Sequence, residues 1–333
     1  MVTDTRSRPL RDLRISVTDR CSFRCGYCMP REIYDGHTYL ERAEILSYGE
    51  IRRITRLATD LGVRKVRLTG GEPLLRSKAY RLVRMLSSLT ELEDLAMTTN
   101  GLLLAREAER LKEAGLDRVT VSLDALDDSV FREMIDTDVP VATVLEAIDV
   151  ASDVGLDPVK INTVVRRNRN EDQVLPLLEH FRGTGHTVRF IEFMDVGTTN
   201  SWNLDEVVPS VELLKIISER WKLEPIDPTY RGEVAQRYRF SDGGGEVGFI
   251  SSVSEPFCGD CTRLRLSAEG KLYTCLFASK GTDLKVMLRS DASDDEIRDA
   301  IYRTWSDRTD RYSELRGGTP LGFPKVEMSY IGG

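Results

Sequence analysis

Several features are scarce or missing in this 333-residue chain, and each absence excludes a class of protein. No apolar run approaches the roughly 18 residues of a membrane-spanning helix. The first 14 residues are polar and rich in arginine, which argues against a signal peptide. Lysine and arginine number 47 against 54 acidic residues, and the net charge of −7 does not suit a protein that coats nucleic acid or binds a membrane surface. We therefore expect a cytoplasmic protein with neither a nucleic-acid nor a membrane partner.

Histidine and cysteine are also few, which limits the metal sites that the chain can build. The three histidines, His37, His180 and His186, all lie far from any cysteine in the sequence. In a reducing cytoplasm, cysteines are metal ligands or catalysts more often than disulfide partners. All six fall into two groups with none left over: Cys21, Cys25 and Cys28, and Cys258, Cys261 and Cys275.

The first cysteine group has the spacing C-x3-C-x2-C and directly follows the alternating apolar run Leu13–Thr18. A [4Fe–4S] cluster normally takes four cysteinates, one for each iron. Three local ligands therefore indicate a cluster with one iron left open. A structural zinc site that lacks its fourth ligand, or three buried thiols, are the alternatives.

The second group is a C-x2-C pair, Cys258 and Cys261, with Cys275 fourteen positions later. Zinc is a stronger alternative here, because such a set can take any fourth ligand. The ligand count favours a second [4Fe–4S] cluster, again with an open iron.

Short apolar runs alternate with longer amphipathic ones from residue 13 to about 194, which predicts parallel strands connected by helices. The expected strands are Leu13–Thr18, Lys65–Thr69, Asp94–Thr99, Arg118–Leu123, Val159–Val164 and Val188–Met194. The expected helices are Gly49–Leu61, Lys78–Leu89, Leu102–Ala114, Val141–Val154 and Asp172–Phe181.

Most of these strands have one apolar and one polar face, whereas strands buried on both faces of an open parallel sheet are almost wholly apolar. A dry lumen lined by charged side chains would be severely destabilising. The pattern therefore favours a barrel or half-barrel whose lumen holds a polar ligand. Its expected basic residues are Arg14, Lys65, Arg67, Lys160 and Arg189.

The alternation of expected strands and helices stops at about residue 195. Helices are expected at Val211–Trp221 and Asp294–Trp305, and short β segments between residues 231 and 275, with a hairpin turn at 242–245. We accordingly divide the chain into residues 1–230, a barrel with an N-terminal extension, and residues 231–333, a C-terminal region with its own metal site.

A second motif, Gly70-Gly71-Glu72-Pro73, follows the second expected strand. It therefore lies at the same end of the barrel as the first cysteine group, where parallel α/β barrels place their active-site loops. Two glycines let the backbone approach a ligand closely, and Glu72 can accept a hydrogen bond from an ammonium group.

Together, C-x3-C-x2-C with Tyr27 before the last cysteine and the Gly-Gly-Glu-Pro motif resemble the radical S-adenosylmethionine (radical SAM) enzymes. The segments 249–254 and 256–265 and the Gly332-Gly333 tail are similar to one family among them, GTP 3′,8-cyclase of molybdenum cofactor biosynthesis. The likeness spans nearly the whole chain. It departs at Ser22, where the family more often has Asn, and it is poor over Thr3–Arg11.

The resemblance implies a partial (β/α)6 radical SAM barrel, closed by a C-terminal segment that carries the second [4Fe–4S] cluster. It implies a lyase in which SAM, bound at the first cluster, yields a 5′-deoxyadenosyl radical that removes the ribose 3′ hydrogen of GTP. The C3′ radical then attacks guanine C8, and reduction gives (8S)-3′,8-cyclo-7,8-dihydroguanosine 5′-triphosphate. An electron-donor protein and, as product acceptor, cyclic pyranopterin monophosphate synthase are the implied partners. A homodimer also remains open.

The resemblance also assigns roles to residues. The second cluster's open iron would bind the guanine edge, and the glycine tail would reach toward the lumen arginines. Cys21, Cys25 and Cys28 would hold the SAM cluster, and Cys258, Cys261 and Cys275 the second one. The expected SAM site comprises Tyr27, Gly71, Glu72, Ser122, Asn162 and Met194. The expected GTP site comprises Arg14, Lys65, Arg67, Thr98, Lys160, Arg189, Arg263, Leu264 and Arg265.

Two alternatives remain from the sequence. One is a radical SAM enzyme of peptide maturation with an auxiliary cluster, although such enzymes typically carry more C-terminal cysteines. The other is a non-catalytic module in which both cysteine groups bind zinc.

Overall fold

A single 12-stranded sheet organises the computed structural model, which describes residues 1–315 and 325–332. The strand order is β12-β11-β10-β1-β2-β3-β4-β5-β6-β9-β8-β7. The strands are β1 (Asp12–Ser16), β2 (Lys65–Thr69), β3 (Asp94–Thr99), β4 (Arg118–Ser122), β5 (Lys160–Val165), β6 (Thr187–Glu192), β7 (Leu223–Ile226), β8 (Gln236–Phe240), β9 (Glu246–Ile250), β10 (Arg263–Leu266), β11 (Lys271–Tyr273) and β12 (Thr282–Asp283).

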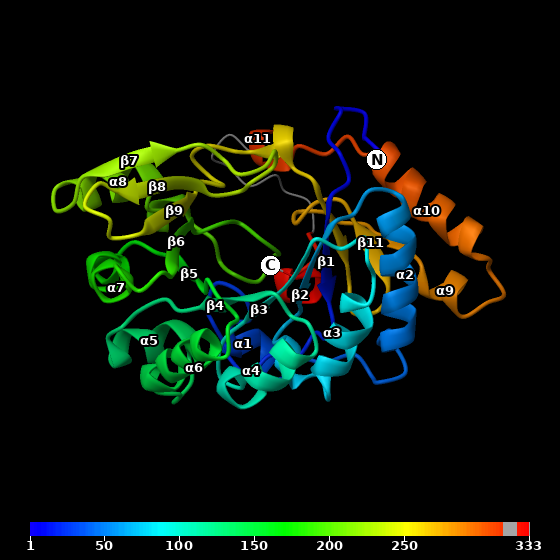
Figure 1. Cartoon of the computed structure of the whole chain (residues 1–333), viewed down its shortest axis with the longest axis horizontal. Helices are drawn as coiled ribbons and strands as arrows, with labels where there is room; N and C mark the ends of the chain where they lie inside the picture. Colours follow the sequence, from blue (N-terminus) through cyan, green and yellow to red (C-terminus); the bar gives the residue numbers. More distant parts are fainter. Residues whose placement is uncertain (316–324, 333) are drawn as a thin grey trace.

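The six central strands, β1 to β6, are parallel and follow one another in chain order. They form an arc with helices on its outer side (Figure 1). These helices are α2 (Tyr48–Asp60), α3 (Ala79–Ser87), α4 (Leu104–Glu113), α5 (Asp128–Ile135), α6 (Val141–Asp153) and α7 (Val174–Phe181). The arc confirms the expected strand–helix alternation, and of these six helices only α5 has no counterpart among those expected from the sequence.

Alternation along the strands determines which side chains face the helices. In β1, Leu13 and Ile15 are fully buried in the hydrophobic core, and in β2 the same holds for Val66. The side chains between them face the inside of the arc, because successive residues of a strand point to opposite faces. The core therefore lies between sheet and helices, and the polar faces are left to line the lumen.

Two C-terminal strands extend this arc at its opposite edges. Strand β9 pairs in parallel with β6, and β10 pairs in parallel with β1. The turn expected at residues 242–245 connects β8 and β9, which pair antiparallel as a hairpin. Residues 251–262 connect β9 to β10 and thus run from one edge of the arc to the other.

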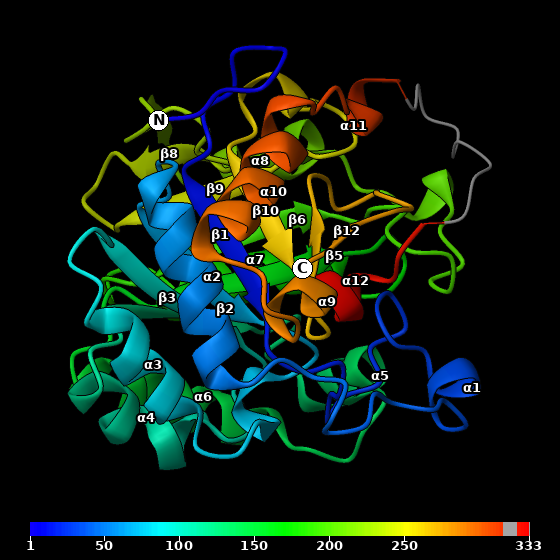
Figure 2. The same cartoon turned by 90° about the vertical axis from the view of Figure 1, so that its right-hand side faces the viewer.

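The remaining α-helices lie outside the series that covers the arc. They are α1 (Arg31–Tyr34), α8 (Ser210–Ser218), α9 (Lys285–Leu288), α10 (Asp294–Ser306), α11 (Tyr312–Leu315) and α12 (Met328–Ile331). Helix α10 begins with a capping box between Ser293 and Glu296. In Figure 2, the N-terminal segment passes close to α10. Of the helices in the described part of the chain, none has the length and apolar character that a membrane crossing requires.

Candidate active site

A cavity of about 480 Å³ occupies the inside of the arc. It is lined from one side by loops that follow the strands and from the other by the C-terminal segments. Every residue expected from the sequence to bind a cluster, SAM or GTP lines this cavity, apart from Leu264. The side chain of Leu264 is instead fully buried in the hydrophobic core, because its neighbours Arg263 and Arg265 occupy the opposite face of β10.

The first cysteine group lies in the loop after β1. The backbone N–H groups of Cys28 and Met29 both donate to the carbonyl oxygen of Cys25, at 2.9 Å each. Burial raises the pKa of the Cys21 thiol to about 11, and it also raises the pKa values of Cys25 and Cys28. Three neighbouring thiols are therefore neutral until a metal displaces their protons.

Gly71 allows the Gly-Gly-Glu-Pro segment to pack against this cysteine loop. A Cβ atom at Gly71 would lie 2.2 Å from the carbonyl oxygen of Arg20 and 3.0 Å from the backbone nitrogen of Cys21. No side chain fits there, so the two loops approach each other as bare backbone.

The carboxylate of Glu72 is held by three hydrogen bonds. It accepts from the N–H of Leu74 at 3.0 Å, the hydroxyl of Thr99 at 2.8 Å and the N–H of Asn100 at 2.7 Å. Burial raises the pKa of Glu72 to about 7. This fixed orientation suits a carboxylate that accepts from a bound ammonium group.

Tyr27 is bonded to a buried acid that the sequence did not single out. Its hydroxyl donates to Asp124 at 2.8 Å, and the other oxygen of Asp124 accepts from the N–H of Val164 at 2.9 Å. Burial raises the pKa of Asp124 to about 6. The pair connects the cysteine loop to the ends of β4 and β5.

Asn100 is a second residue of the site that the sequence did not single out. Its side-chain amide donates to the Ser22 hydroxyl at 2.9 Å. Asn100 and Asp124 both follow the carboxyl end of a strand, as the Gly-Gly-Glu-Pro motif does. That position was the sequence signal that could have identified them.

Basic side chains crowd the opposite part of the lumen. Arg67 donates to the hydroxyls of Thr98 at 3.0 Å and Thr120 at 2.9 Å. Burial, with repulsion from neighbouring arginines, lowers the pKa of Arg67 to about 10, of Arg189 to about 9 and of Lys160 to about 7. Buried cations that repel one another need an anionic partner, so this part of the lumen suits a polyanion.

Lys65 differs from these cations because it has partners of its own. Its ammonium group lies 3.1 Å from Asp94 and donates to the Tyr230 hydroxyl at 3.0 Å. Asp94 also pairs with Arg118 at 2.6 Å. Neither Asp94 nor Tyr230 was predicted, and the loop that carries Tyr230 has no strand periodicity that could have placed it here.

Several buried polar atoms in the cavity region have no hydrogen-bond partner within the described residues. They include Oδ1 of Asn162 and the Nε atoms of Arg189 and Arg263. Buried polar groups are nearly always hydrogen-bonded, so these atoms are suited to bond a ligand that has both donor and acceptor groups. The unpaired donors and acceptors of the cavity therefore match the polar groups of SAM and a nucleotide.

The second cysteine group lines the same cavity from the C-terminal side. Nη2 of Arg263 donates to the sulfur of Cys261 at 3.3 Å. Burial alone would raise the pKa of Cys261, but Arg263 and Arg308 outweigh it and lower the pKa to about 6. Burial raises the pKa of Cys275 to about 12.

A mononuclear zinc site would bring its ligands to within about 2.3 Å of a single ion. Across residues 1–315 and 325–332, no three His, Cys, Asp or Glu side chains are arranged to hold one metal ion. A [4Fe–4S] cluster instead takes each cysteinate at a separate corner. The six cysteines of the two groups line the cavity.

The end of the chain also enters this region. Arg265 donates to the carbonyl oxygen of Gly332. A Cβ atom at Gly332 would lie 2.4 Å from the hydroxyl of Thr69, so a side chain has no room there. Gly333, the other residue of the expected tail, lies outside the described residues.

Comparisons with known proteins agree with this arrangement. Residues 15–181 match the model of the Radical SAM superfamily, and residues 186–314 match the model described as Molybdenum Cofactor Synthesis C. A structure of Streptococcus suis SuiB bound to S-adenosylmethionine aligns with a TM-score of 0.62 at 16% identity, over 88% of this chain and 68% of that one. The protein is thus a member of the radical SAM superfamily, and the expected partial barrel is confirmed.

Full-length relatives give a narrower assignment. A GTP 3′,8-cyclase from Acidothermus cellulolyticus is 51% identical, over 100% of this chain and 99% of its own. One from Xanthomonas axonopodis pv. citri is 52% identical, over 99% and 98%, and one from Staphylococcus epidermidis is 46% identical, over 100% and 99%. The chain belongs to the GTP 3′,8-cyclase family.

Proposed function

We propose that this protein is a lyase that converts GTP to (8S)-3′,8-cyclo-7,8-dihydroguanosine 5′-triphosphate, the first step of molybdenum cofactor biosynthesis. One observation supports it most strongly. Two separate three-cysteine groups face one cavity, and buried cations without enough anionic partners line the lumen between them. A single-cluster enzyme has no need of the second group, and a zinc module has no need of the cations.

The residues expected at each cofactor have suitable chemistry. Cys21, Cys25 and Cys28 would hold one [4Fe–4S] cluster, and Cys258, Cys261 and Cys275 a second. When bound at the first cluster, SAM supplies a 5′-deoxyadenosyl radical able to remove a hydrogen atom from the substrate ribose. The SAM site would be formed by Tyr27, Gly71, Glu72, Ser122, Asn162 and Met194.

In this proposal, Glu72 accepts from the methionine ammonium group, because its carboxylate already has a fixed orientation. Gly71 lets SAM and the cysteine loop share a bare backbone surface. Asn162 has an unpaired acceptor atom for a donor on the cofactor. These residues orient SAM and exclude water from it, which protects a reactive intermediate.

GTP carries about four negative charges without magnesium, and a buried anion needs paired cations. We assign its triphosphate to Arg14, Lys65, Arg67, Lys160 and Arg189, with Thr98 as a hydroxyl contact. Arg263 and Arg265 would contact the nucleotide from the C-terminal side, and Leu264 would contribute backbone alone. The guanine would then lie toward the second cysteine group, with its ribose toward the first.

Anaerobic purification and turnover test the proposal. Two clusters predict about eight irons per chain. The reduced protein with SAM should form 5′-deoxyadenosine above background with GTP and not with ATP, CTP or UTP. Zinc without iron would contradict the enzyme, and failure of GTP to raise 5′-deoxyadenosine would contradict the substrate.

Two partners follow from the reaction. Cleavage of SAM requires one electron, so we propose an electron-donor protein that reduces the first cluster. The cyclic nucleotide must be passed on, and cyclic pyranopterin monophosphate synthase is the proposed acceptor. The division at residue 230 and a homodimer also stay predictions.

A further inference from the structure

The N-terminal segment, residues 3–9, contains a buried arginine, Arg8. Arg8 is fully buried, and its Nε lies 2.5 Å from Asp4, whose side chain is also fully buried. Asp4 accepts from the backbone N–H groups of Arg6 and Arg8 at 2.9 Å each. The segment is therefore a compact turn built around one internal ion pair.

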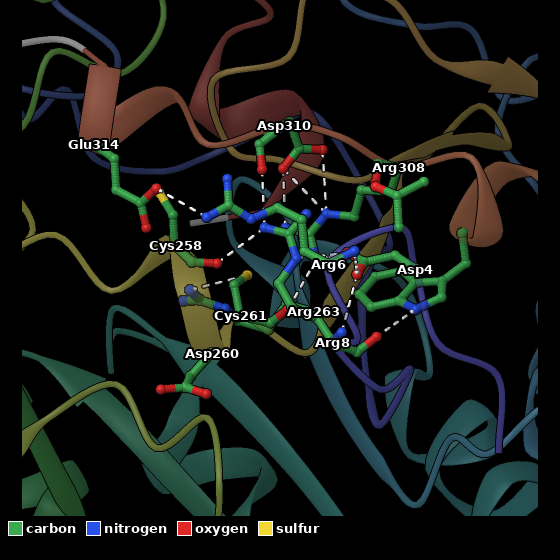
Figure 3. Close-up of polar contacts among 12 residues, drawn as sticks. Asp4, Arg6, Arg8, Cys258, Asp260, Cys261, Arg263, Arg308, Asp310 and Glu314 are labelled. Carbon is green, nitrogen blue, oxygen red and sulfur yellow. Dashed lines mark hydrogen bonds and ion pairs between the residues drawn. The ribbon is translucent and has the colours of Figure 1, made fainter.

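Arg8 also connects this turn to the second cysteine group. Its Nη1 donates to the carbonyl oxygen of Cys258 at 2.9 Å and to that of Asp310 at 2.8 Å (Figure 3). The indole N–H of the buried Trp305 donates to the carbonyl oxygen of Arg8 at 3.1 Å. Both ends of the arginine residue are thus fixed.

Arg308 does the same for the other cysteine of the C-x2-C pair. Its Nη1 donates to the carbonyl oxygen of Cys261 at 2.8 Å, and its Nε bonds both oxygens of Asp310 at 3.1 Å. The Arg308 side chain is only 2% exposed and lies over the ring of Trp305. The Thr5 hydroxyl donates to the Arg308 carbonyl oxygen at 2.6 Å.

The two cysteines of one turn are therefore held by arginines from opposite ends of the chain. Arg8 is paired with Asp4 and Arg308 with Asp310, so the network is close to electrically neutral. Hydrogen bonds from a charged donor are stronger than neutral ones, so their loss should loosen the turn that carries the two cysteines. A turn fixed in this way would keep Cys258 and Cys261 ready for a cluster.

We propose that Arg8 and Arg308 are positioning residues for the second cluster: they clamp the carbonyls of Cys258 and Cys261, which makes the N-terminal segment part of that metal site. This inference rests on the proposed second cluster. It gives residues 4–8 the role of holding the turn that carries Cys258 and Cys261. The reaction chemistry alone does not indicate this role. Neither arginine needs to contact the nucleotide for this role.

The test isolates the second site by using a parent in which Cys21, Cys25 and Cys28 are replaced by alanine. After anaerobic reconstitution, this parent should hold about four irons per chain. Arg8→Gln and Arg308→Gln, each added to the parent, should speed removal of that iron by an excess of chelator at least about tenfold, equivalent to about 1.4 kcal/mol. After chemical reduction of the cluster with dithionite, its electron paramagnetic resonance signal should also broaden or shift.

One matched control, Arg6, lies in the N-terminal segment, and the other, Arg231, lies in the loop before β8. Arg6 pairs with Glu314 at 3.4 Å and Arg231 pairs with Asp260 at 2.9 Å; both pairs are partly exposed, and within residues 1–315 and 325–332 neither arginine bonds a cysteine carbonyl. Arg6→Gln and Arg231→Gln should therefore release iron at the parent's rate.

A reciprocal background separates positioning from unfolding. With Cys258, Cys261 and Cys275 replaced by alanine, Arg308→Gln should leave iron in the first cluster unchanged. Equal loss from both backgrounds would mean that the variant is misfolded and would overturn the proposal. Iron release at the parent's rate, in the background that lacks Cys21, Cys25 and Cys28, would also overturn the proposed role of the arginines. That result would leave the proposed second cluster itself unaffected. A parent that binds no iron contradicts the second cluster and with it this inference.

Discussion

Lys160 gives a sharp test of the basic lumen, because its protonation should be coupled to GTP binding. Burial and repulsion from Arg189 and Arg118 lower its pKa to about 7 in the free protein. At pH 8, about 90% of the free protein therefore has a neutral Lys160. A bound triphosphate restores the charge, so GTP binding should take up about 0.9 proton at pH 8.

The direction of the pH dependence of GTP binding follows from this proton uptake. Because the bound state holds the extra proton, affinity for GTP should fall as pH rises above 7, by about tenfold per pH unit until the raised pKa of the complex is reached. Below pH 7 both states are protonated and this dependence disappears. Lys160→Met should lose the proton uptake and also about 1.5–3 kcal/mol of binding at pH 6.5, since a hydrogen bond to a charged group is removed.

Calorimetric titration of the cluster-loaded protein with GTP, without SAM, measures both quantities when it is run in buffers of different ionisation enthalpy. Lys160→Arg is the matched control, because it keeps the charge but does not titrate in this range. Protonation of GTP itself is common to all three proteins and cancels in the comparison. Identical proton uptake by wild type and Lys160→Met would refute the argument.

Two further substitutions test the SAM side of the cavity. Tyr27→Phe removes a 2.8 Å hydrogen bond from buried Asp124 and should cost about 1–3 kcal/mol of stability, measured by urea denaturation of the cluster-loaded protein, while exposed Tyr302→Phe should have no effect. Gly71→Ala should weaken SAM binding more than about tenfold in equilibrium dialysis, because its Cβ would overlap the backbone of the cysteine loop. Gly49→Ala, whose Cβ meets nothing closer than 3.9 Å, should bind SAM normally. Normal SAM binding by Gly71→Ala would show that the two loops separate freely.

Much of the lumen could be predicted because strand geometry is periodic. Arg14, Arg67 and Lys160 alternate with apolar residues, and the structure brings all three to one cavity. The same periodicity explains the exception. Leu264 lies between two lumen arginines in β10, so its side chain has to point to the core.

Other features could not be predicted, since they depend on contacts between distant parts of the chain. The sequence indicates short β segments after residue 231, but not that β10 would pair in parallel with β1. Asp124 is bonded to Tyr27 across 97 residues. Arg8 binds backbone carbonyls, and a carbonyl has no side-chain pattern that marks it as a partner.

The connection between β9 and β10 limits how the arc can open. Residues 251–262 run from the end of β9 to the start of β10, and a fully extended chain of that length reaches about 40 Å at most. The segment carries Cys258 and Cys261, whose carbonyls are held by Arg8 and Arg308. The segment is therefore a short connection that is also held by hydrogen bonds within its length. Any widening of the arc would therefore have to move the turn that carries Cys258 and Cys261 or break its hydrogen bonds to the two arginines.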